Sequence, residues 1–332
     1  MIYAFLLGGL FLGWSFGRSN LSTVFGTAVG TRMVSFRFAA SLAAVFIFLG
    51  AVLSSSETAE SVLEIGRVGS IQGAFLISCI IGCVMLLANY WGVPVSIVQC
   101  FIGALIGWNC FFQIQNNWVV LMEMISAWFY APLLAAFFAG ICFCIVRYVF
   151  YKVHFPILYR DFGVRILLIL GGVYSSYFLG ANNMPAIAGP YLSVNNLAPL
   201  MVILSIGIAI CIGIFMADKK VISMVSSGLF PLSSLEALVV VFSCGLALCC
   251  FSSRWLCDLL ISCGLPSFPL VPIPTTNILV GSIVGVGCTK KCSGVQWRSL
   301  IKIVVSWFWV PLISGLICWF VLAMLNEGGI VL

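Results

Sequence analysis

The sequence predicts an all-α polytopic membrane protein with about ten transmembrane or re-entrant helical segments in two inverted repeats with broken helices. Of its 332 residues, 63% are hydrophobic and 7% are charged, whereas soluble domains carry about 25% charged residues. The chain therefore has too few polar residues to cover a water-facing surface. Its long apolar runs lack the alternation of a β-barrel, so helices are the expected way to pair the backbone in lipid.

Ten apolar runs are visible, five on each side of a short basic connection. We expect an N-terminal transmembrane repeat over 1–148, a short cytoplasmic linker over 149–163 and a C-terminal transmembrane repeat over 164–332. The runs are 2–31, 36–54, 70–90, 94–112, 118–148, 164–192, 197–217, 234–252, 268–289 and 300–325.

Three sequence blocks of the first half match three blocks of the second half in the same order, which predicts an internal repeat. Each pair shares glycine, proline or tryptophan at corresponding places. The pairs are Gly17-Arg18-Ser19-Asn20 with Gly180-Ala181-Asn182-Asn183, Pro94-Val95-Ser96 and the following Gly103 with Pro274-Thr275-Thr276 and the following Gly281, and the Trp-to-Pro blocks 128–132 and 307–311.

The basic residues predict the orientation of the halves. With the linker in the cytoplasm, twelve basic residues fall inside and two outside, as the positive-inside rule requires. Each half then has an odd number of spans, so the halves are inverted, an arrangement typical of transporters with a shared midplane site. The inner residues are Arg32, Arg37, Arg147, Lys152, Arg160, Arg165, Lys219, Lys220, Lys290, Lys291, Arg298 and Lys302, and the outer ones are Arg67 and Arg254.

The net charge of +6 is spread between apolar runs, where it acts as a topology signal, so we expect no nucleic-acid partner. The partner that the composition requires is a lipid bilayer. We expect a multi-pass integral protein of the bacterial inner membrane.

Small and polar residues interrupt the first apolar run of each half, and these interruptions predict broken helices over 17–23 and 180–185. Uncapped helix ends, amides and hydroxyls at such breaks favour anion binding. Polar residues after the prolines either cap the next helix or bind an anion oxygen. Arg18 either contacts the anion or snorkels to the interface. The candidate substrate-binding residues are Arg18, Ser19, Asn20, Ser96, Gln99, Asn182, Asn183, Thr275, Thr276 and Asn277.

The remaining ionisable residues give weaker signals. Glu123 and Glu236 either bind a cation or proton or sit at helix ends. Cys288 and Cys292 form a weak metal pattern, and the single histidine, His154, stands far from them. Since no nucleophile with a base is apparent, we expect neither an enzyme nor a bound cofactor or metal.

Three motifs carry a family resemblance: Gly180-Ala181-Asn182-Asn183, the stretch 25–32, and Pro94-Val95-Ser96 through Gln99 with the following 103–107. Through them the sequence resembles the inorganic phosphate transporter (PiT) family over essentially its whole length, as a short member without the large central hydrophilic domain. The resemblance implies a phosphate carrier working by alternating access as a cation-coupled symporter, with Na⁺ or H⁺ as coupling ion. It also implies a cation site near Asn20 and Asn183, and we expect a homodimer.

The sequence departs from the family pattern at the motif aspartates, which are Asn20 and Asn183 here. Because Na⁺ prefers charged or carbonyl oxygen ligands, the loss of two carboxylates disfavours Na⁺ coupling. A sulfate or related oxyanion permease and a degenerate, non-transporting member therefore remain alternatives. Phosphate can donate a hydrogen bond and sulfate cannot, so a site made only of donors would favour sulfate.

Overall fold

A computed structural model describes residues 2–66, 68–152, 156–194, 197–217, 219–290 and 294–328. Arg67, His154, Lys291 and Cys292 lie outside these ranges, and so do the predictions made on them. The elements within them are α1 (Ile2–Val24), α2 (Gly26–Gly30), α3 (Phe36–Leu53), α4 (Ser56–Ile65), α5 (Ile71–Tyr90), α6 (Ile97–Phe112), α7 (Trp118–Lys152), α8 (Ile157–Leu192), α9 (Pro199–Phe215), α10 (Lys219–Ser223), the π-helical turn η1 (Met224–Gly228), α11 (Ser234–Ser252), α12 (Arg254–Ser262), α13 (Thr275–Thr289) and α14 (Trp297–Glu327).

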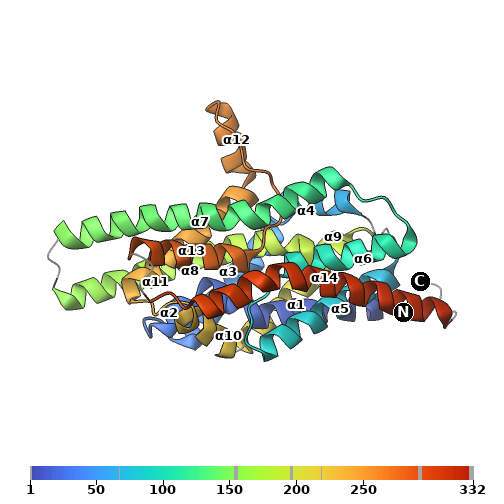
Figure 1. Ribbon diagram of the computed structural model, residues 1–332, viewed down its shortest axis with the longest axis horizontal. Coiled ribbons are helices and arrows are strands. Elements are labelled where there is room, and N and C mark those ends of the chain that lie inside the picture. The colour runs from blue at the N-terminus through green and yellow to red at the C-terminus, as the bar shows by residue number, and fades with distance from the viewer. Residues whose placement is uncertain are drawn as a thin grey trace.

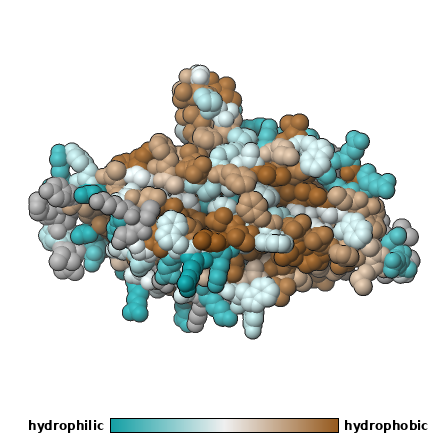
Figure 2. All heavy atoms as spheres, viewed as in Figure 1, coloured by the Kyte–Doolittle hydropathy of each residue, from teal (hydrophilic) through white to brown (hydrophobic). Residues whose placement is uncertain are grey.

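The all-helical prediction is confirmed, and each predicted apolar run contains a helix. Within the described ranges, six helices are long and apolar enough to cross a membrane: α3, α5, α7, α8, α11 and α14. The helices α6, α9 and α13 are apolar but shorter, so the count of ten segments stays a prediction. Apolar residues cover much of the visible surface, and hydrophilic residues lie toward the two ends of the long axis and along part of the lower edge (Figure 2).

The predicted breaks over 17–23 and 180–185 are wrong, because α1 and α8 continue through both segments. Polar side chains there bond within the protein. Ser22 Oγ donates to the carbonyl of Ser19 at 2.6 Å. Pro185 has no N–H for the carbonyl of Ala181 four residues earlier, and Thr58 Oγ1 donates to that carbonyl instead, at 3.4 Å. The chain is interrupted elsewhere, at Phe25, over 91–96 and over 263–274.

The helices form two groups, and each group takes helices from both halves of the chain. In one group α1 packs on α9 and α3 packs on α8. In the other, α6 packs on α14 and α7 packs on α13. The helices α5 and α11 contact members of both groups. The halves are therefore interlocked, since each needs the other to cover its helices.

Close glycine contacts at the helix crossings repeat between the halves. A side chain at Gly17 of α1 would collide with the backbone of α9, and one at Gly180 of α8 would collide with the backbone of α3. Likewise, a side chain at Gly103 would collide with the carbonyl of Pro311, and one at Gly281 with the carbonyl of Pro132. The same crossings are thus built twice from corresponding residues, as an internal repeat requires.

Corresponding helices run in opposite directions along the long axis. The N- and C-termini lie near the same end, and α7 runs away from that end while α14 runs toward it (Figure 1). This is the inverted arrangement. The predicted linker over 149–163 contains the end of α7 and the start of α8, and the division into two domains stays a prediction.

The crossings also fix the register of the repeat. Helices α6 and α13 begin at Ile97 and Thr275, and the sixth residue beyond each start is a glycine in contact with a proline of the other half. Pro94 therefore corresponds to Pro272, and the pairing with Pro274 is wrong by two residues. In this register Gln99 corresponds to Asn277.

We predict that Gly281→Ala destabilises the protein by about 1–3 kcal/mol, because its Cβ would force the backbone of α7 away from α13. Gly140→Ala is the matched control, since Gly140 also lies inside a helix but has open space around it. Alanine there should be neutral or stabilising by up to about 1 kcal/mol. Thermal unfolding of the detergent-solubilised protein measures both, and equal effects would contradict the close crossing.

Candidate functional site

The predicted polar residues gather where α6 and α13 begin, beside the C-terminal parts of α1 and α8. Helix α1 contacts α13, and α8 contacts α6. The side chains are buried: Asn20 is 3% exposed, Ser96 and Gln99 are 1% exposed, and Asn183 is fully covered. Buried polar groups need partners, so the hydrogen bonds of this cluster show which atoms are available to a ligand.

Asn20 is held by its own helix and faces the start of α13. Its Nδ2 donates to the carbonyl of Phe16 at 3.1 Å, which leaves Oδ1 turned toward the second half. The hydroxyls of Thr275 and Thr23 both lie 3.5 Å from that oxygen. Thr23 lies in α1 itself, so one long, weak hydrogen bond, that from Thr275, joins Asn20 to the other repeat.

Asn183 is held in the same way on α8. Its Nδ2 donates to the carbonyl of Leu179 at 2.9 Å. Its Oδ1 is buried and has no hydrogen-bond partner among the residues that the structure describes. A buried acceptor without a partner is uncommon and marks a place where a ligand can bind.

The start of α6 presents donors to the same region. Ser96 Oγ and Gln99 Nε2 are buried without a hydrogen-bond partner in the described part of the chain. Ser96 makes no side-chain cap, and Pro274 cannot cap α13. The capping alternative for Ser96 is therefore wrong. Both helices begin in the interior with uncapped first-turn N–H groups, which favour negative charge.

Thr276 and Asn277 lie in the first turn of α13. The side chain of Asn277 bonds to the backbone of α7 and so stabilises the fold. Its Nδ2 donates to the carbonyl of Trp128 at 3.1 Å. Pro132, four residues later in α7, has no N–H for that carbonyl. Asn277 thus supplies the donor that the proline removes. Thr276 Oγ1 donates to Asn277 Oδ1 at 3.4 Å.

Ser19 and Asn182 also position other groups. Ser19 Oγ donates to Asn89 Oδ1 at 3.0 Å, and Ser252 Oγ donates to Asn182 Oδ1 at 3.4 Å. Both pairs are separated by 70 residues along the chain, so they are repeat equivalents with serine and asparagine exchanged. Asn89 and Ser252 were not predicted from the sequence. Each is a polar residue at the end of an apolar run, 70–90 and 234–252, and this position could have marked it as a candidate.

Asn182 also holds the extended segment before α13. Its Nδ2 donates to the carbonyl of Ile273 at 2.8 Å, and the N–H of Ile273 donates to its Oδ1 at 3.0 Å. Because Ile273 lies between Pro272 and Pro274, its N–H is the one backbone donor of these three residues. Asn182 therefore fixes the direction in which α13 begins.

Arg18 is not brought into this cluster. Its guanidinium lies 5.0 Å from the centre of the Trp14 ring, whose Nε1 donates to the sulfur of Met216. Arg18 and Asn20 are two residues apart in a helix, so they project about 200° apart around its axis. Arg18 therefore lies on the opposite face of α1 from Asn20, beside Trp14.

The acidic candidates lie at a helix start and on the surface. Glu236 is in the first turn of α11, where it forms a capping box with Ser233 and an ion pair with Lys290. Glu123 is exposed. Among the buried polar side chains that the structure describes, Glu236 is the one ionisable group. The polar cluster at α6 and α13 is therefore built from neutral side chains and helix dipoles.

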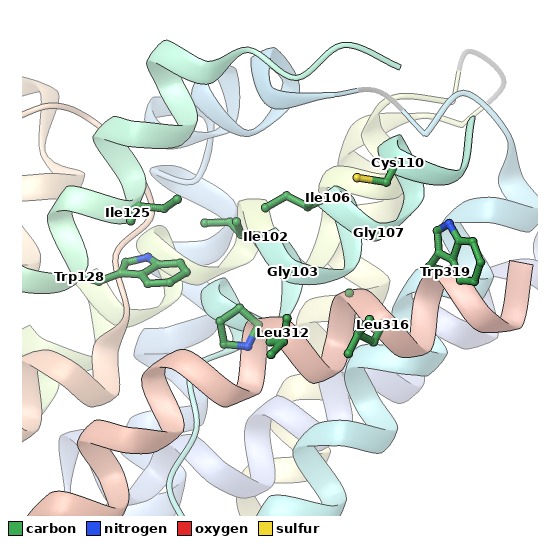
Figure 3. A pocket seen from close by; sticks show the side chains of 12 residues that line it. Ile102, Gly103, Ile106, Gly107, Cys110, Ile125, Trp128, Leu312, Leu316 and Trp319 are labelled. Atoms are coloured by element: carbon green, nitrogen blue, oxygen red, sulfur yellow. The ribbon is translucent and has the colours of Figure 1, made fainter. Parts of the chain in front are cut away.

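A separate groove of about 550 Å³ lies between α6, α7 and α14. Figure 3 shows its lining, which includes Ile102, Ile106, Leu312, Leu316 and Trp319. This apolar lining suits an acyl chain or another helix and does not suit an inorganic anion. The predicted polar residues do not line it.

The inverted helical repeats and the buried polar cluster between them define a multi-pass integral membrane protein of the carrier type. The phosphate transporter family matches residues 16–318, and the chain belongs to this family. A Methanocaldococcus jannaschii protein named for phosphate permease activity is 26% identical over 94% of each chain. The sulfate permease CysP of Bacillus subtilis is 23% identical over 95% of this chain and 85% of its own.

A solved structure, titled as the sodium-dependent phosphate transporter, has the same fold. The TM-score is 0.76 at 21% sequence identity, and the match covers 97% of this chain and 99% of the other. The predicted family and fold class are thereby confirmed.

We predict that Asn277→Ala destabilises the protein by about 1–3 kcal/mol, because the carbonyl of Trp128 loses its donor. The double variant Asn277→Ala/Pro132→Ala should recover part of this loss, since alanine at position 132 restores the helical N–H to that carbonyl. Unfolding of the four proteins in a double-mutant cycle measures the coupling. Additive effects would show that Asn277 does not replace the missing N–H.

Proposed function

We propose that this protein carries phosphate across the membrane, and that the cluster at the starts of α6 and α13 is the substrate site. The observation that supports this most strongly is the set of buried atoms without partners in the described part of the chain. Ser96 Oγ and Gln99 Nε2 can donate to an anion, and Asn183 Oδ1 can accept from one. The family membership supports phosphate as the anion.

The electrostatics of the cluster suit an anion. A helix N-terminus carries roughly half a positive charge, and two such ends lie at the cluster with no buried carboxylate beside them among the described residues. An oxyanion can bond to the first-turn N–H groups and to the hydroxyl and amide donors. We place the substrate contacts at Asn20, Ser96, Gln99, Asn183 and the threonines Thr275 and Thr276. Ser19, Asn182 and Asn277 are positioning residues in this proposal.

The helix arrangement supports alternating access. The cluster lies between the group of α1, α3, α8 and α9 and the paired helices α6–α14 and α7–α13. The contacts between the groups near the cluster include the long, weak hydrogen bond from Thr275 Oγ1 to Asn20 Oδ1. Small movements of one group against the other can break this bond and expose the site to either side.

We propose that transport is coupled to a cation gradient, with Na⁺ or H⁺ as the coupling ion. The structural relative is titled as sodium-dependent. Here Asn20 and Asn183 offer neutral amide oxygens to a cation site, so Na⁺ should bind more weakly than it would between carboxylates. We further propose the bacterial cell membrane as the location and a homodimer as the assembly.

A second candidate is a sulfate or related oxyanion permease. It is favoured by the similarity to CysP along nearly the whole chain. Transport of either anion requires no bond-making chemistry, so both candidates are carriers and not enzymes.

Uptake of labelled phosphate into proteoliposomes tests the proposal. Ser96→Ala and Gln99→Ala should each raise the KM for phosphate by about tenfold or more, because a hydrogen bond to a charged ligand is lost. Ser306→Ala is the matched control, since the Ser306 hydroxyl bonds to its own helix in α14. It should leave the KM unchanged.

The same assay tests coupling by replacing Na⁺ with choline at constant pH and by imposing a pH gradient without Na⁺. Uptake should respond to one of these gradients. Absence of phosphate and sulfate uptake under every gradient would contradict a carrier and would support the non-transporting alternative.

A further inference from the structure

The motif asparagines of the two repeats, Asn20 and Asn183, differ in the hydrogen bonding of Oδ1, although both side chains are held in the same orientation. Nδ2 of Asn20 and Nδ2 of Asn183 each donate to the carbonyl four residues earlier in the helix. A flipped amide would set an oxygen against that carbonyl oxygen, so Oδ1 must be the atom that faces the cluster.

The oxygen of Asn20 is satisfied within the protein. It lies near the hydroxyls of Thr23, three residues later in α1, and of Thr275, the first residue of α13. At the equivalent positions around Asn183 the chain has Ala186 and Ile97, the first residue of α6. Neither side chain can donate a hydrogen bond, which explains why Asn183 Oδ1 has no partner in the described part of the protein.

We propose that Asn183 Oδ1 makes this site selective for a protonated tetrahedral oxyanion, that is, for phosphate over sulfate. The inference rests on the proposed function and names its specificity-determining residue. Near neutral pH phosphate retains at least one O–H, which can donate to Asn183 Oδ1. Sulfate has no proton, so it would leave this acceptor unsatisfied and set oxygen against oxygen.

The donors in the site do not discriminate between these anions. Ser96 Oγ and Gln99 Nε2 can bond to an oxygen of either one. Selectivity therefore depends on the acceptor, and a site that pairs a substrate O–H rejects analogues without it. An unsatisfied buried acceptor costs enough to give at least about tenfold discrimination.

The test uses four anions of similar shape: phosphate and arsenate, which keep a proton near pH 7, and sulfate and selenate, which do not. Each is measured by binding to the purified protein and by inhibition of phosphate uptake in proteoliposomes. The wild type should prefer the protonated pair by about tenfold or more. Asn183→Leu should bring the two pairs to within about threefold of each other.

A second variant removes the acceptor without changing Asn183. Ile97→Thr places a hydroxyl where Thr275 stands in the other repeat, so Asn183 Oδ1 gains an internal donor. It should also reduce the preference, and it keeps the proposal testable if Asn183→Leu does not fold. Ser96→Ala is the matched control, because it removes a donor and should weaken all four anions by the same factor.

Three outcomes would overturn the proposal. The first is a wild type that does not distinguish the pairs or prefers sulfate, in which case the chain is still an anion carrier. The second is a preference that survives in both variants. The third is loss of cation dependence in Asn183→Leu with unchanged anion preference, which would make Asn183 a cation ligand. A wild type that neither binds nor carries any of the four anions would overturn the proposed function as well.

Discussion

Helices α6 and α13 begin inside the protein, and most of their first-turn N–H groups have no carbonyl of a preceding turn to bond. The exception is Asn277, whose N–H donates to the carbonyl of Pro274 at 3.1 Å. In a membrane such groups are costly unless the protein or a ligand pairs them. The extended segments before each start, the glycine crossings at Gly103 and Gly281, and the asparagine contacts all hold these two ends in place. The proposed site lies where these two helix starts face a common interior.

The polar residues around these starts divide into two kinds. Asn182, Asn277 and Thr58 bond to backbone groups that prolines isolate or leave without a donor. They let the chain turn or bend beside the proposed binding site. Asn183, Ser96 and Gln99 keep polar atoms without partners in the described part of the chain. The repeat supplies the same framework twice, and the differences between the copies decide which atoms remain for a ligand.

The amino-acid sequence predicts the membrane class, the repeat and most residues of the cluster. These predictions depend on local features of the chain, namely the length of the apolar runs and the positions of glycines, prolines and basic residues. It does not predict that α1 and α8 stay helical through 17–23 and 180–185, since the donors that stabilise them, such as Thr58, lie far away in the chain. The orientation of Arg18 depends on the helix face, and the separate roles of Asn182 and Asn183 depend on contacts with Ile273. Such contacts between distant segments cannot be read from residue type alone.

The central claim is that an oxyanion binds between the starts of α6 and α13. The most direct measurement is the anomalous scattering of arsenate in crystals of the protein soaked with that anion. We predict one peak within hydrogen-bond distance of Ser96, Gln99 and Asn183, and its disappearance when phosphate is added in excess. A peak only at surface arginine and lysine side chains, or no peak at saturating arsenate, would contradict the account.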